Sequence, residues 1–521
     1  MRVSKIEKAM NVNRKELMRF STSLLFIIAI MLFTTVRVDN SEHGVLLVVA
    51  AMIGGYMAMN IGANDVANNV GPAVGSHAIT LFGAIAIAAL FEAGGALIAG
   101  GDVVGTIKNG IINPELIGNS DTFIWLMIAA LLAAAIWLNI ATSIGAPVST
   151  THSIVGGVLG AGVAAGGWGI ANWSTVIQIA ASWIISPVLG GIIAAAFLYL
   201  IKRTITYRDD VTAAARRIVP TLIALMAWAF ATYIMLKGVK HIWKVSFPLA
   251  ALIGLGFAAL VFMLVRPSIA RKADSMANHK DSVNELFTIP LIFAAALLSF
   301  AHGANDVANA VGPLAGINEA IATGGVSTKA HIPLWVMLVG AIGISLGLAL
   351  YGPKLIRTVG SEITELDKIR AFCIAMAAAL TVILASQLGL PVSSTHIAVG
   401  GVFGVGFLRE FLKVSYARML EDIRYHHQVE GTSPEAVEEF IARFEKANVT
   451  KRGVLLEELK KKNGSQILHK AERKGLGRIH RLELVKRSML FMIAAAWVVT
   501  VPLAGVLAAM IFFMIRGILI P

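Results

Sequence analysis

Two short stretches place an asparagine and an aspartate inside apolar sequence, and the two are nearly identical. The first is GANDVANNVGP at 62–72, and the second is GANDVANAVGP at 303–313. Each follows a long apolar run of the kind that spans a membrane. A lone acid in such a place can be a satisfied polar spot between helices. A repeated acid indicates a binding site, because ionisable residues are costly in lipid.

The amide and carboxyl groups of these stretches could bind a cation. A hard cation such as Na⁺ takes oxygen ligands from carboxylates, amides, hydroxyls and free backbone carbonyls. At spacings of three and four, side chains share one face of a helix. The six residues so placed are Asn64, Asp65, Asn68, Asn305, Asp306 and Asn309. Proton transfer through the two aspartates is the rival hypothesis, since carboxylates also serve as proton relays.

A second repeated stretch carries hydroxyl groups, as GAPVSTTH at 145–152 and GLPVSSTH at 389–396. Glycine and proline interrupt the apolar sequence there, as they do where a discontinuous membrane helix begins. Free N–H groups and the helix dipole at such a start favour an anion, and hydroxyls add donors. The hydroxyls expected to bind a tetrahedral oxyanion are those of Ser149, Thr150, Thr151, Ser393, Ser394 and Thr395.

The competing interpretation is that these hydroxyls only cap a buried kink. His152 and His396 follow the two triplets, and we expect them, like Asn68 and Asn309, to support the site rather than bind directly. Glu92 lies within an apolar run. It is a third candidate membrane carboxylate, either for a cation or as a structural partner.

Asp65 and Asp306 would repel an anion unless cations lie between the acids and the anion. A site of this kind does not by itself separate phosphate from sulfate, because both are tetrahedral. A protonated phosphate oxygen can donate a hydrogen bond to a carboxylate, whereas sulfate cannot. Direct contact of the substrate with Asp65 or Asp306 would therefore favour phosphate.

The composition describes a helical membrane protein. Of 521 residues, 57% are hydrophobic and 14% are charged, with a mean hydropathy of +0.75, whereas a soluble domain has about 25% charged residues. The apolar runs are continuous rather than alternating, which excludes a β-barrel. We predict an all-α polytopic fold with about 11–13 membrane segments, embedded in the lipid bilayer.

The net charge of +13 lies in the loops between apolar runs, so the positive-inside rule explains it better than nucleic-acid binding. The only cysteine, Cys373, lies in an apolar run, and the sequence has no Cys/His metal cluster. No nucleophile and base are arranged for catalysis. We therefore expect neither an enzyme nor a cofactor.

A third repeated block, AASWIISP at 180–187 and AAAWVVTVP at 494–502, follows the other two in the same order. The first two blocks recur at offsets of 241 and 244 residues. The positive-inside rule places the basic N-terminus and the basic loops 202–217 and 266–280 on the inner side of the membrane. The second half of the chain then starts on the inner side and the first half on the outer side. Inverted repeats of this kind are typical of secondary transporters with a site near the midplane.

Five parts follow from this pattern, in a plasma membrane or a bacterial inner membrane. They are a basic N-terminal extension with the first span (1–43), the first repeat (44–201), linking spans with basic cytoplasmic loops (202–285), the second repeat (286–408 and 488–516) and a polar cytoplasmic insert (409–487). The sequence leaves open whether the chain forms a homo-oligomer.

The repeated GANDVANA and PVSSTH blocks resemble those of the inorganic phosphate transporter (PiT) family, over 44–201 and 286–516. The resemblance implies a symporter of orthophosphate with Na⁺ or H⁺, and the GANDVANA form favours Na⁺. Some relatives carry metal-phosphate complexes or sulfate. Carried over by motif, Asp65 and Asp306 with Asn64 and Asn305 would bind the cation, the six hydroxyls would bind phosphate, and Glu92 would match a family glutamate. Family members often have an acid in the span before the second hairpin, where 369–387 has none and Ala375 lies near the expected place.

The leading hypothesis is a Na⁺-coupled importer of inorganic phosphate that works by alternating access. An H⁺-coupled phosphate or metal-phosphate symporter and a sulfate permease on the same fold are alternatives. From another class, the protein would be a membrane receptor or scaffold that acts through the insert 409–487. In that case Asp65→Asn would leave its function intact.

Overall fold

The computed structural model describes residues 2–38, 42–143, 148–238, 243–324, 332–362, 367–429 and 487–519. These residues form helices, and one isolated bridge joins Ile112 to Ala171. Eleven stretches among them are long and apolar enough to cross a membrane. The predicted all-α polytopic class and its number of segments are confirmed.

The first half of the chain contains most of the short helical turns. Its elements are α1 (Arg2–Thr35), α2 (Glu42–Asn64), α3 (Val66–Gly75), α4 (Leu81–Ala99), α5 (Gly101–Gly105), the π-helical turn η1 (Thr106–Gly110), η2 (Pro114–Leu116), α6 (Ser120–Ser143), α7 (Thr150–Gly166), η3 (Trp168–Ile170), α8 (Trp173–Ile201) and η4 (Lys202–Thr206).

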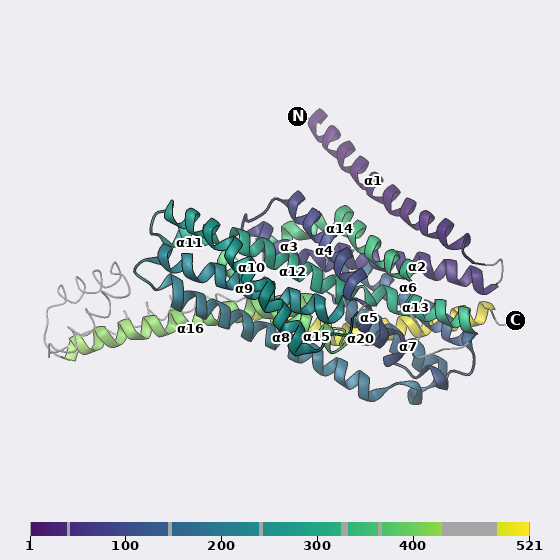
Figure 1. Cartoon of the computed structure of the whole chain (residues 1–521). Helices are drawn as coiled ribbons and strands as arrows, with labels where there is room; N and C mark the ends of the chain where they lie inside the picture. Colours follow the sequence, from purple (N-terminus) through teal and green to yellow (C-terminus); the bar gives the residue numbers. More distant parts are fainter. Residues whose placement is uncertain are drawn as a thin grey trace.

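The linking helices and the second half follow. They are α9 (Val211–Lys237), α10 (Phe247–Asp274), α11 (Lys280–Leu286), α12 (Thr288–Asp306), α13 (Ala308–Thr323), α14 (Leu334–Glu362), α15 (Lys368–Gln387), α16 (Ser394–Val429) and α20 (Arg487–Leu519). The insert predicted from residue 409 begins inside α16, which continues without a break to Val429 and extends beyond the bundle (Figure 1). The rest of the predicted insert, 430–486, lies outside the described residues.

Each Asn-Asp pair lies where one helix ends and another begins. Helix α2 ends at Asn64, next to Asp65, and α12 ends at Asp306. Pro72 in α3 and Pro313 in α13 follow shortly after. A proline cannot donate to the carbonyl four residues earlier and its ring crowds that carbonyl, so the helix is weakened there. Both acids lie at helix junctions rather than in the middle of a regular helix, and the prolines weaken the helices that follow these junctions.

The hydroxyl triplets begin α7 and α16. The Ser149 hydroxyl accepts a hydrogen bond from the His152 N–H, and the Ser393 hydroxyl accepts one from the His396 N–H, both at 3.3 Å. These are N-cap bonds. Before α16 the chain turns at Gly389, whose φ of +67° suits a residue without a side chain. Helices α6 and α7 pack together as one hairpin, and α15 and α16 as another.

The two halves pack on each other reciprocally: α2 lies along α14 and α12 along α4, while α7 lies along α20 and α16 along α8 (Figure 1). Glycines let the backbones touch at these crossings. A Cβ on Gly62 would lie 1.9 Å from the Ile344 carbonyl oxygen, and one on Gly303 would lie 2.2 Å from that of Glu92. Such exchange of partners is expected of two repeats related by a two-fold axis. Their inversion in the membrane, and the five-part division of the chain, stay predictions.

The crossing of α16 and α8 gives a direct test of this packing. A Cβ on Gly404 would lie 2.0 Å from the Gly191 carbonyl oxygen, which belongs to a helix backbone and cannot move alone. We expect Gly404→Ala to lower the free energy of unfolding of the purified protein by about 1–3 kcal/mol, the typical cost of overpacking. Thermal unfolding in detergent measures this. Gly256→Ala in α10, where nothing lies within 4 Å, is the control. Equal melting temperatures of the two variants would contradict the close crossing.

Candidate functional site

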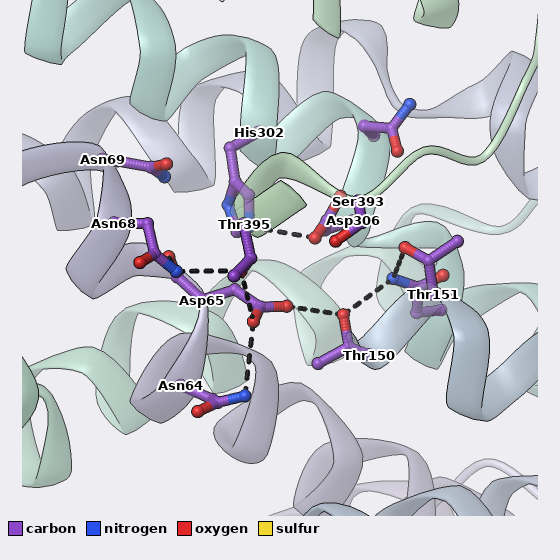
Figure 2. A network of polar contacts seen from close by, with 12 residues as sticks. Asn64, Asp65, Asn68, Asn69, Thr150, Thr151, His302, Asp306, Ser393 and Thr395 are labelled. Carbon is purple, nitrogen blue, oxygen red and sulfur yellow. Dashed lines mark hydrogen bonds and ion pairs between the residues drawn. The ribbon is translucent and has the colours of Figure 1, made fainter. Parts of the chain in front are cut away.

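The junction at Asp65 and the starts of α7 and α16 meet in the interior. Asp65 is 2% exposed. One of its carboxylate oxygens accepts a hydrogen bond from the Thr150 hydroxyl at 2.6 Å, and the other accepts one from the Thr395 hydroxyl at 3.2 Å. Figure 2 shows Asp65 between these two threonines. Because Thr150 belongs to the first hairpin and Thr395 to the second, both halves contribute to the surroundings of one carboxylate.

Two asparagines connect each half to the hairpin of the other half. The Asn68 amide donates to the Thr395 hydroxyl at 2.8 Å (Figure 2). The Asn309 amide donates to the hydroxyls of Thr150 and Thr151 at 3.2 and 3.1 Å. The predicted supporting positions of Asn68 and Asn309 therefore lie in direct contact with the hydroxyl triplets.

Asn64 and Asn305 hold the chain that leads into each hairpin helix. The Asn64 amide donates to the Val148 carbonyl at 3.1 Å, and to Asp65 at 3.3 Å. The Asn305 amide donates to the Leu390 carbonyl at 3.1 Å, and its oxygen accepts from the Val392 N–H at 3.2 Å. Both side chains position the hairpins. That Asn64 and Asn305 also bind a cation stays a prediction.

Asp306 has different neighbours from Asp65. One of its carboxylate oxygens lies 3.0 Å from the Nε2 atom of His302, and the Nδ1 atom of His302 lies 2.7 Å from a Glu92 oxygen. The Asn69 amide donates to the other Glu92 oxygen at 2.8 Å. Glu92 and His302 are fully buried. Glu92 therefore reaches the site through His302 rather than touching Asp65.

The sequence did not single out His302 or Asn69. A signal was present for His302, which precedes Asp306 by four residues, one turn of helix α12. No spacing in the sequence distinguishes Asn69 from its neighbour Asn68. The role of Asn69 is shown only by its hydrogen bond to Glu92 on α4.

The acids lie close enough together to bind a common cation. Asp65, His302 and Asp306 each offer one ligand atom, and these atoms lie within 4.8 Å of one another. Three further polar atoms, Asp306 Oδ1, Asn309 Oδ1 and Ser394 Oγ, are buried and meet no hydrogen-bond partner among the described residues. Buried polar atoms normally have partners. Carboxylate, amide and hydroxyl oxygens of this kind are the ligands that a hard cation takes.

The six hydroxyls divide into three kinds. Ser149 and Ser393 cap their helices, as the competing interpretation expected. Thr150 and Thr395 donate to Asp65, and Thr151 donates to the Val392 carbonyl at 3.0 Å. Ser394 is the one with no partner in the described part of the chain. Anion binding by these groups stays a prediction.

The two histidines after the triplets contact each other, so the first turns of α7 and α16 lie close together. The rings of His152 and His396 have centroids 4.8 Å apart, and the His152 ring lies 3.7 Å from that of Trp183. The helix N-termini of the two halves therefore lie side by side. This is the arrangement that an oxyanion between two positive helix ends requires.

Two buried lysines form ion pairs near the short helical turns α5 and η1. Lys108 on η1 forms an ion pair with Glu319 on α13, and both side chains are about 5% exposed or less. Lys237 at the end of α9 pairs with Asp102 on α5. The Thr106 hydroxyl donates to the Gly389 carbonyl at 2.7 Å. The segment 102–108 is thus held by two ion pairs and by a hydrogen bond to the turn before α16.

Comparison with known proteins agrees with this geometry. The sequence pattern described as "Phosphate transporter family" matches residues 61–508. A relative from Helicobacter pylori strain J99, named "Putative phosphate permease", is 52% identical over 520 residues and covers 98% of this chain and 97% of its own. A relative of the same name from Chlamydia trachomatis is 38% identical over 400 residues, or 73% of this chain and 93% of its own.

A solved structure is also similar. It is titled "The sodium-dependent phosphate transporter", is 33% identical, and aligns with a TM-score of 0.74 over 91% of this chain and 100% of that one. The resemblance found in the repeated motifs is confirmed, and the family consists of transporters rather than enzymes. On this evidence the chain belongs to the phosphate transporter family.

Proposed function

We propose that this protein imports inorganic phosphate with Na⁺ by alternating access, across a plasma membrane or a bacterial inner membrane. The observation that supports it most is the position of Asp65, whose two carboxylate oxygens accept one hydroxyl from each hairpin. A site shared by two halves can be opened to either side by moving one half against the other. The name of the similar solved structure agrees with sodium coupling.

The charges explain why substrate and cation would bind together. Buried carboxylates of Asp65 and Asp306 repel an anion, while the starts of α7 and α16 attract one. Na⁺ bound by the two acids, with Asn64, Asn305 and the unpaired Asn309 oxygen as further ligands, would neutralise the repulsion. Phosphate would then lie against the hydroxyl triplets, so neither solute binds well alone. Glu92 acts through His302 in this scheme.

Proton coupling is the second candidate, and one specific contact favours it. His302 lies between two buried carboxylates, at 2.7 Å from Glu92 and 3.0 Å from Asp306. Such carboxylate and histidine chains carry protons in other membrane transporters. Sulfate in place of phosphate is favoured by no contact in the site.

Uptake into proteoliposomes tests the proposal. Labelled phosphate uptake is measured with Na⁺ or choline outside, at two pH values, with sulfate as competitor. We expect uptake to require Na⁺ at both pH values and to be insensitive to sulfate. Uptake driven equally well in choline by an inward proton gradient would show proton coupling. Loss of phosphate uptake to competing sulfate would identify a sulfate permease.

The Ser394 hydroxyl offers a test of substrate contact. Since it has no partner among the described residues, Ser394→Ala removes no native hydrogen bond. We expect about a tenfold rise in the phosphate concentration for half-maximal uptake, since a hydrogen bond to a charged group contributes about 1.5–3 kcal/mol. The melting temperature should not change. Ser153→Ala, which removes only a hydrogen bond to the backbone carbonyl of the N-cap residue Ser149, is the control. Wild-type phosphate affinity in Ser394→Ala would remove this hydroxyl from the site.

A further inference from the structure

We propose that a row of neutral polar side chains on α2 and α6 is the path by which the coupling cation reaches Asp65. The path presupposes the proposed Na⁺ coupling and adds where the ion travels. Tyr56, Asn60 and Asn64 recur every four residues along α2, so they share one face. Asp65 follows directly at the inner end of this row.

Hydrogen bonds join the row to α6. The Asn139 amide donates to the Asn60 oxygen at 2.9 Å and also bonds to the Tyr56 hydroxyl. The Asn60 amide donates to the Tyr56 carbonyl at 3.1 Å. Asn139 is exposed, Tyr56, Asn60 and Asn64 are half-buried, and Asp65 is buried. The polar groups therefore lead from the surface of the bundle to the carboxylate.

The second half of the chain builds the same helices and keeps a counterpart of Asn64, which is Asn305, but it lacks the other three polar groups. At the repeat offsets of 241 and 244 residues, the counterparts of Tyr56, Asn60 and Asn139 are Leu297, Ala301 and Ile383. All three counterparts are buried. The fold itself therefore does not require the polar row, and some other property must account for it.

The chemistry of the row favours a cation. Exposed amides in apolar membrane helices are costly unless they line a water-filled path or meet protein. Amide and hydroxyl oxygens can replace water around Na⁺. The row carries no positive charge and ends on a carboxylate, which attracts a cation and repels phosphate.

Cysteine labelling tests the path directly. The single cysteine, Cys373, is buried, so Cys373→Ala provides the background. Asn139→Cys, Asn60→Cys and the matched control Ile383→Cys are placed in proteoliposomes. A cationic and an anionic methanethiosulfonate reagent, both membrane-impermeant, are supplied on both sides. We expect the two asparagine positions to react faster with the cationic reagent, and Na⁺ to slow that reaction. Ile383→Cys should not react.

Three outcomes would overturn the path. The first is no reaction at Asn139→Cys or Asn60→Cys beyond that of Ile383→Cys. The second is reaction only with a membrane-permeant maleimide, which would show that this face meets lipid. The third is a disulfide-linked dimer of Asn139→Cys under oxidant, which would show that a second copy covers it.

Transport gives a second readout. Asn60→Ala and Asn139→Ile copy the residues of the second half, so both should fold. We expect the Na⁺ concentration for half-maximal uptake to rise about tenfold, the effect of one lost polar contact, with phosphate affinity unchanged at saturating Na⁺. An unchanged Na⁺ dependence in both variants would contradict the path. If the background variant takes up phosphate without Na⁺, the proposed coupling fails instead, whatever the labelling shows.

Discussion

Asp65→Asn is expected to lower Na⁺-dependent phosphate uptake by at least about 100-fold, equivalent to about 2.7 kcal/mol. The amide has nearly the shape of the carboxylate and retains one oxygen acceptor. The negative charge that would bind Na⁺ between the two hairpins is lost. The hydroxyls of Thr150 and Thr395, both directed at Asp65, would lose a charged acceptor. Initial rates of labelled phosphate uptake in proteoliposomes measure the effect.

Asp306→Asn should also nearly abolish uptake, because the second acid would no longer pair with His302 or bind a cation. Asp274→Asn is the matched control. Its carboxylate lies in an exposed ion pair with Arg216, and such pairs contribute little. Normal uptake by both Asp65→Asn and Asp306→Asn, at wild-type protein levels, would rule out cation binding by the two acids.

Lys108→Met is expected to reduce the free energy of unfolding by about 3–5 kcal/mol, because it leaves the Glu319 carboxylate buried and unpaired. The double variant Lys108→Met with Glu319→Leu should regain most of this stability, since an apolar pair can replace a buried ion pair. Thermal unfolding of the purified single and double variants in detergent measures both effects.

The exposed pair of Arg216 and Asp274 supplies the control for this experiment. Arg216→Met should cost no more than about 1 kcal/mol. If Lys108→Met were no more destabilising than Arg216→Met, Lys108 would not be buried against Glu319. If the double variant were as unstable as the single, the loss would come from packing rather than from an unpaired charge.

The sequence predicted the elements of the site because the repeat carries them twice. Asn-Asp pairs at the ends of apolar runs singled out Asp65 and Asp306 as membrane carboxylates, whereas the helix junctions at which they lie are a finding of the structure. Glycine, proline and hydroxyl residues in a fixed order predicted the starts of α7 and α16. These signals are local, so they can be read without knowing which helices pack together.

Contacts between distant helices could not be predicted in this way. Glu92 was expected either to bind a cation or to be a structural partner, and the partners that the structure gives it, His302 and Asn69, depend on the packing of α4 against α12 and α3. Lys108 and Glu319 lie far apart in the sequence, and nothing in the sequence near either residue pairs them. Only the fold shows that they are buried together. Ser149 and Ser393 bear out the capping role that was the competing interpretation.

Equilibrium binding tests most directly whether one buried site holds phosphate and Na⁺ together. Labelled phosphate is titrated onto the purified protein in Na⁺ or in choline, with wild type and Asp65→Asn side by side. We expect saturable phosphate binding to wild type in Na⁺. The phosphate affinity should be at least about tenfold weaker in choline and in the Asp65→Asn variant. Equal phosphate affinity under all three conditions would contradict a site in which Asp65 binds the cation that phosphate requires.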